Sequence, residues 1–68
     1  MKDNTDEFEL RIAISDMAWE VDSLRDIEQS YVDSEEYEKA SIVLARQKRL
    51  IRLIKNKEKQ LKKYEDTL

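Results

Sequence analysis

Apolar residues recur along the first half of the chain at intervals that mostly alternate between three and four residues. The stripe consists of Leu10, Ile14, Met17, Val21, Leu24 and Tyr31, and Ala13 and Ile27 widen it. This spacing predicts an amphipathic helix with one apolar face about six turns long. Because Glu28 takes a slot that a strict heptad gives to a hydrophobe, we expect the face to drift to Ile27.

The second half of the chain repeats the pattern and predicts a second amphipathic helix. Its apolar line runs along Tyr37, Ala40, Leu44, Gln47, Ile51, Ile54 and Leu61, with Val43, Leu50, Tyr64 and Leu68 beside it. Most of its bases lie toward its far end, where the helix dipole favours positive charge.

The break between the two helices has to be inferred from capping residues, because the chain contains no glycine and no proline. Asp33 fits an N-cap and Glu36 its capping-box partner, while Val32 and Tyr37 are spaced as a hydrophobic staple. Ser34 is an alternative cap one residue later. These signals predict that a second helix starts just after residue 33.

Asn4 is a good N-cap for the first helix, and Glu7 can close a capping box with it. We therefore predict an all-α fold, an antiparallel two-helix hairpin with helices over residues 4–32 and 34–66 in a single domain, 1–68. The alternative is one unbroken helix of about 60 residues, roughly 90 Å long.

Charge is divided between the two halves of the chain. Residues 1–38 carry thirteen acids and three bases, net −10, and residues 39–68 carry ten bases and three acids, net +7. Folding at residue 33 places residues whose numbers sum to about 66 side by side on the two antiparallel helices. Opposite charges then meet along the length of the hairpin. The expected pairs are Glu9 with Lys57, Glu7 with Lys59 and Asp3 with Lys63.

The same folding leaves an acidic turn end and a mildly basic open end. Residues 20–45 carry eight acids and two bases, net −6, and the rest of the chain comes to +3. This polarity favours two hairpins lying side by side in opposite directions. The alternative is that the charges are merely solvated, since exposed ion pairs contribute only about 0 to 1 kcal/mol each.

Catalytic chemistry is not expected from this composition. The chain has no histidine, cysteine or glycine, so it lacks a side chain that titrates near neutrality, a thiolate nucleophile and a phosphate-binding loop. The one notable carboxylate pair, Asp22 and Asp26, is most simply a solvated acidic face. We expect no enzyme activity, no cofactor and no metal. With no apolar run near the ~20 residues that span a bilayer, we also expect a cytoplasmic protein.

Three apolar residues of the first helix, Phe8, Ile12 and Trp19, project nearly opposite its main stripe at 100° per residue. A chain of 68 residues buries only about 60% of its unfolded surface, and this one lacks disulfides or zinc ligands as staples. We therefore predict that these residues form an interface with a second copy, giving a dimeric four-helix bundle, or with another helical protein. The alternative is a frayed terminus with scattered apolar residues.

The acidic residues of the turn, Asp33, Glu35 and Glu36, are expected to steer the approach of a partner, an effect on association rate more than on affinity. The predicted function is accordingly that of a small non-catalytic protein interaction module, acting as an adaptor, accessory or regulatory protein.

Basic residues of the second helix form a further candidate surface. Six of them project to one side: Lys48, Arg49, Arg52, Lys55, Lys59 and Lys63. They fit contacts to nucleic-acid phosphates, to another acidic surface, or to water alone. The acids of the first helix are positioned to neutralise them and only Tyr64 lies near for stacking. Non-specific nucleic-acid binding is therefore the alternative function, and we expect none at physiological salt.

The second predicted helix begins with Tyr37, Glu38, Lys39 and Ala40, followed by Val43 and by Leu50 ten residues after the alanine. These residues resemble the UVR motif, a short helical hairpin of bacterial excision-repair subunits and of adaptor proteins of Clp-type chaperone systems. The family's Arg-Asp pair falls on Leu44 and Ala45, and a usual Ile falls on Gln47. The resemblance covers about residues 20–51 and implies a non-catalytic hairpin that pairs with another helical hairpin.

Overall fold

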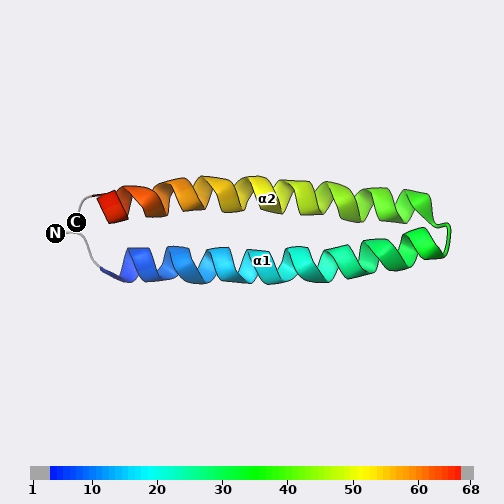
Figure 1. Cartoon of the computed structure of the whole chain (residues 1–68), viewed down its shortest axis with the longest axis horizontal. Helices are drawn as coiled ribbons and strands as arrows, with labels where there is room; N and C mark the ends of the chain where they lie inside the picture. Colours follow the sequence, from blue (N-terminus) through cyan, green and yellow to red (C-terminus); the bar gives the residue numbers. More distant parts are fainter. Residues whose placement is uncertain (1–3, 67–68) are drawn as a thin grey trace.

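The computed structural model describes residues 4–66, which form two antiparallel helices of 30 residues each: α1 (Asn4–Asp33) and α2 (Tyr37–Asp66). Figure 1 shows the helices side by side, with the start of α1 (blue) and the end of α2 (red) at the end opposite the turn. The molecule is a slender rod of 53 × 14 × 12 Å. The two-helix hairpin prediction is confirmed, and the unbroken helix is excluded.

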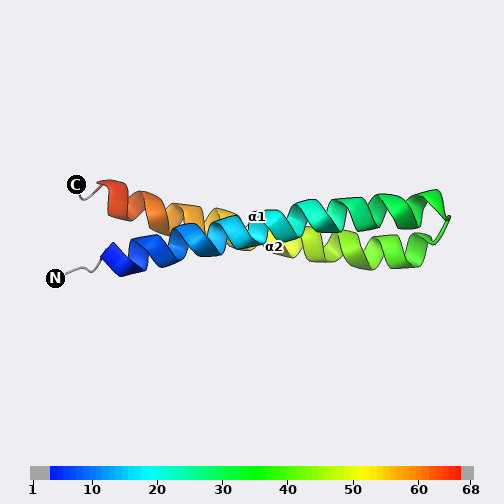
Figure 2. The same ribbon diagram turned by 90° about the horizontal axis from the view of Figure 1, so that it is seen from below.

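The residues between the helices follow a heptad spacing in both helices. In α1 they are Glu7, Leu10, Ile14, Met17, Val21, Leu24, Glu28 and Tyr31. In α2 they are Ala40, Val43, Gln47, Leu50, Ile54, Lys57, Leu61 and Tyr64. We call these two rows the seam; all of its side chains are buried or half-buried. A strict alternation of three and four residues is the packing pattern of a coiled coil, and Figure 2 shows the helices crossing near their middle.

The predicted drift of the α1 face is wrong. Ile27 is 43% exposed, whereas Glu28 keeps its half-buried place in the seam. Glu28 is accommodated because the amide of Gln47 donates a 2.8 Å hydrogen bond to its carboxylate. Gln47 is itself only 4% exposed, so each polar group provides the partner that the other needs on burial.

The predicted apolar face of α2 is wrong by one residue at two of its positions, because the seam contains residues 43 and 50 instead of 44 and 51. Tyr37 and Leu44 are exposed, and Val43 and Leu50 occupy the seam instead. Rows that include residues 43 and 50, or residues 44 and 51, have the same heptad period, so periodicity does not distinguish them. Packing against α1 selects the first row, in which Leu50 is only 6% exposed.

The turn ends α1 in a Schellman motif. The amide of Glu36 donates to the Tyr31 carbonyl at 2.8 Å, and the amide of Glu35 donates to the Val32 carbonyl at 3.0 Å. Glu35 supplies the left-handed residue of the motif, with φ of 61°. The carbonyl of Glu36 then accepts the amide of Ala40 at 3.0 Å, which starts α2.

The predicted N-cap at Asp33 is therefore wrong. Asp33 is the last residue of α1, and α2 begins at Tyr37 instead of residue 34. Ser34, the alternative cap, lies in the turn, and Glu36 is the residue before the helix instead of a capping-box partner. Val32 and Tyr37 are both exposed, so the expected staple buries little surface. The Schellman bonds explain the difference, because they use the last carbonyls of α1 and extend that helix through residue 33.

The three-residue turn also changes the register. Because α1 ends at residue 33 and α2 begins at residue 37, level positions have numbers that sum to about 70. Two ion pairs join the helices, Arg46 with Glu20 at 2.7 Å and Arg11 with Glu65 at 3.3 Å. Their residue numbers sum to 66 and to 76, one below and one above 70. In the second pair, the base comes from α1 and the acid from α2, opposite to the expected polarity.

Two of the charge pairs expected from a sum of 66, Glu9 with Lys57 and Glu7 with Lys59, are not formed, although Glu20 with Arg46 has that sum. Glu9 and Lys57 line the same depression but make no ion pair. Glu7 instead pairs with Arg11 of its own helix at 3.0 Å, and Lys59 is exposed. The third expected pair involves Asp3, which lies outside the described residues.

Candidate functional site

The α1 ridge, consisting of Phe8, Ile12 and Trp19, lies on the outer side of α1, opposite the seam. Its side chains are 64%, 44% and 72% exposed, respectively. The geometry follows from helical spacing, because these three residues project about 180° from the centre of the seam. Within one hairpin, the ridge therefore has no apolar surface to cover it. Exposed single hydrophobes are ordinary on proteins, but a Phe, an Ile and a Trp on one line are typical of an interface.

Carboxylates flank the α1 ridge. Glu9 and Asp16 project on one side of it and Asp22 on the other, while Asp26 continues its line seven residues after Trp19; all four are exposed. Of these, Asp22 lies 3.9 Å from Arg25 of the same helix. The outer side of α1 is thus an apolar line within a negatively charged surface.

The basic ridge occupies the matching outer side of α2. Its six members, Lys48, Arg49, Arg52, Lys55, Lys59 and Lys63, are all exposed. In the part of the chain that the structure describes, none of the six forms an ion pair. The expectation that acids of α1 neutralise this ridge is wrong, because each ridge points away from the other helix.

The three acidic turn residues have separate roles. The Asp33 carboxylate accepts a 2.9 Å hydrogen bond from the Gln29 amide, and Glu35 holds the left-handed position. The Glu36 carboxylate accepts from the Lys39 ammonium at 3.0 Å. This bond, with the attraction between the two charges, raises the pKa of Lys39 above its ordinary 10.5.

The ammonium of Lys39 also lies 5.8 Å from the centre of the Tyr31 ring, within range of a cation–π contact. One of the three turn acids thus has a local countercharge. Asp33 and Glu35 remain as the sources of negative potential at the tip.

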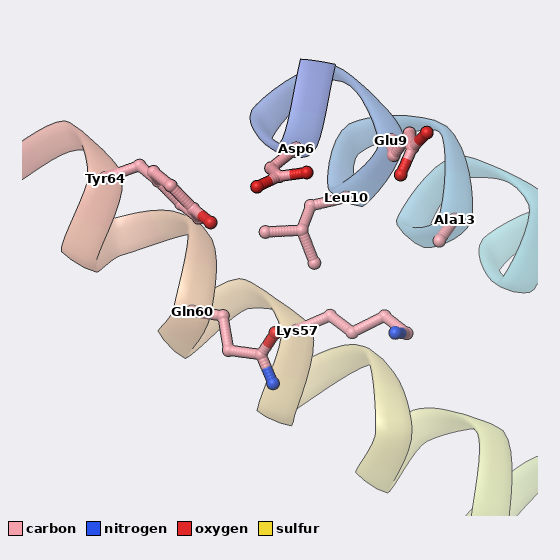
Figure 3. A pocket seen from close by; sticks show the side chains of 7 residues that line it. All are labelled: Asp6, Glu9, Leu10, Ala13, Lys57, Gln60 and Tyr64. Atoms are coloured by element: carbon pink, nitrogen blue, oxygen red, sulfur yellow. The ribbon is translucent and has the colours of Figure 1, made fainter. Parts of the chain in front are cut away.

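A shallow depression of about 390 Å³ opens between the helices near their free ends. Figure 3 shows Leu10 pointing across it toward α2, with Tyr64 extending from α2 toward Asp6. The full lining is Asp6, Glu9, Leu10, Ala13, Lys57, Gln60 and Tyr64. Figure 3 also shows the side chain of Lys57, a seam residue, running along this depression between the helices.

Residues 4–66 contain no group of three or more acidic, histidine or cysteine side chains arranged to hold a metal ion. Neither helix of this described range is both long enough and apolar enough to cross a membrane.

No family model, curated protein or solved structure matches the chain. The likeness to the UVR hairpin rests only on the matching residues given above.

Sequence reasoning missed one exposed apolar residue on the outer part of α2. Ile42 is 71% exposed, as much as Trp19, and Ala45 is exposed close by. Ile42 and Ala45 are three residues apart, and they precede Arg49 by seven and by four residues, respectively. At these spacings the three residues lie on one face of the helix. Knowing the seam row in α2 would have identified them.

Proposed function

We propose that this chain is a small non-catalytic protein interaction module that self-associates through the α1 ridge, two hairpins giving a four-helix arrangement. The observation that carries the proposal is the 72% exposure of Trp19 on a line with two further exposed hydrophobes. Tryptophan is among the residues most enriched at the energetic centres of interfaces. The role fits an adaptor, accessory or regulatory protein whose partner is a copy of itself or another helical protein.

The small core supports the same proposal. Among the described residues, no large side chain is fully buried, and the buried apolar side chains are Val21, Ala40 and Leu50. Association that covers Phe8, Ile12 and Trp19 adds apolar burial at about 25 cal/mol per Å². The hairpin therefore gains in stability from a partner.

Sedimentation equilibrium at micromolar concentration tests the proposal. We expect masses above the 8.2 kDa monomer for the unaltered chain and a shift toward that monomer mass for Trp19→Ala. Ser34→Ala, at an exposed position in the turn, serves as the control. A monomeric chain with a cooperative thermal transition would contradict self-association, and melting of the hairpin by Trp19→Ala would assign Trp19 to the core.

A second candidate function is non-specific binding of nucleic acid by the basic ridge. It is favoured by the exposure of all six bases and by their lack of ion pairs in the described part of the chain. Against it stand the net charge of −3 and the single nearby aromatic residue. Binding would weaken steeply with salt, each phosphate contact adding about 0.7 to 0.9 to the logarithmic slope.

Capture of binding partners from native cytoplasm, with and without nuclease, separates the two candidates. A protein partner survives the nuclease and is lost with Trp19→Ala. If capture instead disappears with nuclease, or with Arg52→Glu and Lys55→Glu while Trp19→Ala leaves it intact, nucleic-acid binding replaces the first proposal.

A further inference from the structure

We infer that the surface that receives the α1 ridge is the outer side of α2 of a second copy, which carries Ala45 and the basic ridge, so that α1 of one hairpin lies beside α2 of the next. This inference rests on the proposed self-association and names its partner surface. The contact is heterologous, because two different faces of the same molecule meet.

The two helices have opposite net charges. α1 contains nine acids and two bases, and α2 contains ten bases and four acids. Two copies meeting α1 to α1 would bring the carboxylates of both ridges together, and like charges juxtaposed at an interface are strongly unfavourable. Meeting α1 to α2 brings acids to the bases that have no partner within their own hairpin.

The acids of α1 and the bases of α2 also have matching spacing along the two helices. When two hairpins lie side by side in opposite directions with their ends aligned, Asn4 is level with Tyr37 of the neighbour, an offset of 33 residues. At this offset Asp16 is level with Arg49. Asp22 and Asp26 are likewise level with Lys55 and Lys59. All six side chains are exposed in the hairpin.

The apolar residues agree with the same offset. Ile12 becomes level with Ala45, whose small side chain leaves room beside the exposed Ile42. Trp19 becomes level with Arg52, and a guanidinium packs well on the face of an indole ring. The apolar ridge thus meets the part of α2 that is least charged, next to an arginine suited to the tryptophan.

A heterologous contact has a consequence that an isologous dimer lacks. Each pair of hairpins leaves one α1 ridge and one basic ridge uncovered, so further copies can add. The dimer with four helices is then the smallest assembly, and larger ones form as concentration rises.

Native mass spectrometry of two variants tests the inference. The first variant, Trp19→Ala, loses the α1 ridge; the second, Arg49→Glu with Lys55→Glu and Lys59→Glu, loses the basic ridge. Alone, each should associate at least about tenfold more weakly than the unaltered chain. Mixed, they should form a 1:1 complex and nothing larger, because one intact ridge of each kind remains.

Two further measurements distinguish loss of the interface from misfolding of a variant. Adding Asp16→Lys, Asp22→Lys and Asp26→Lys to the second variant reverses both ridges and should restore association. In addition, because the chain has no cysteine, Ile12→Cys and Ala45→Cys chains mixed under oxidising conditions should cross-link to each other more than to themselves.

Two outcomes would overturn the inference. If the second variant associates as strongly as the unaltered chain while Trp19→Ala does not, the α1 ridges meet each other; the inference fails and self-association stands. If the unaltered chain is monomeric throughout, the proposed function fails with it.

Discussion

The half of the hairpin next to the turn and the half at the open end are built from the same heptad spacing but packed differently. Every side chain that is buried in the described residues, Val21, Ala40, Gln47 and Leu50, lies in the turn half or at its border. In the open half the seam residues are only half-buried, Lys57 takes one of their places, and a depression opens beside Leu10. The difference in burial indicates that the turn half contributes most of the packing that holds the hairpin together.

The largest effect is expected from Leu50→Ala, which removes the most buried large apolar side chain of the turn half. Truncation of a buried leucine costs about 2 to 5 kcal/mol, a large share of the stability of so small a domain. Leu61→Ala, at a half-buried seam position of the open half, is the matched control and should cost about 1 kcal/mol. Urea unfolding followed by circular dichroism measures both, and equal losses would contradict the difference between the halves.

The next effect concerns the polar pair in the seam of the turn half. Glu28→Ala removes the acceptor of the buried Gln47 amide, and an unpaired buried polar group costs about 1 to 3 kcal/mol. Replacing both residues, Glu28→Leu with Gln47→Leu, should restore or raise stability, because neither polar group is then left unpaired. Thermal unfolding compares the two variants, and a larger loss for the double variant would show that the pair itself stabilises the fold.

Glu35→Gly should raise the free energy of unfolding by about 1 kcal/mol, because glycine adopts a left-handed conformation without the penalty of a Cβ atom. Glu35→Val should destabilise the hairpin for the opposite reason. The free energy of unfolding distinguishes these outcomes. If glycine and alanine at residue 35 behave alike, the left-handed turn is not the conformation in solution.

The smallest effect concerns pH. The pKa of Lys39 is raised by Glu36 in the folded state, so this contribution is fully present below about 10.5, the unfolded value. It is lost as pH rises through the higher folded value. Lys39→Arg keeps the ion pair without titrating in this range, and so the unaltered chain should lose stability relative to that variant only above pH 10.5. A relative loss at neutral pH would contradict the role given to Glu36.

The helical hairpin could be predicted from sequence because spacing and charge both indicate it. Alternation by threes and fours marks the faces of both helices, and it also places Phe8, Ile12 and Trp19 opposite the seam. Their exposure follows from periodicity alone and needs no knowledge of the partner helix.

The details of the turn and register could not be predicted in the same way. No glycine marks the left-handed position at Glu35, and the capping signals at Asp33 compete with a Schellman ending that uses only backbone groups. An error of a few residues in the turn shifts the level positions from a sum of 66 to about 70, which changes the partners expected for Glu7 and Glu9. The two candidate rows of α2 share one period, so only packing against α1 identifies Leu50 as buried.

The central claim, that the α1 ridge is covered by a partner, is tested most directly by the fluorescence of Trp19, the single tryptophan of the chain. Its emission maximum and its quenching by acrylamide should be followed from nanomolar to submillimolar concentration. We expect exposed-indole emission from Trp19 in the dilute chain, and a blue shift with reduced quenching as association proceeds. Emission that stays typical of an exposed indole while sedimentation shows assembled chains would contradict it.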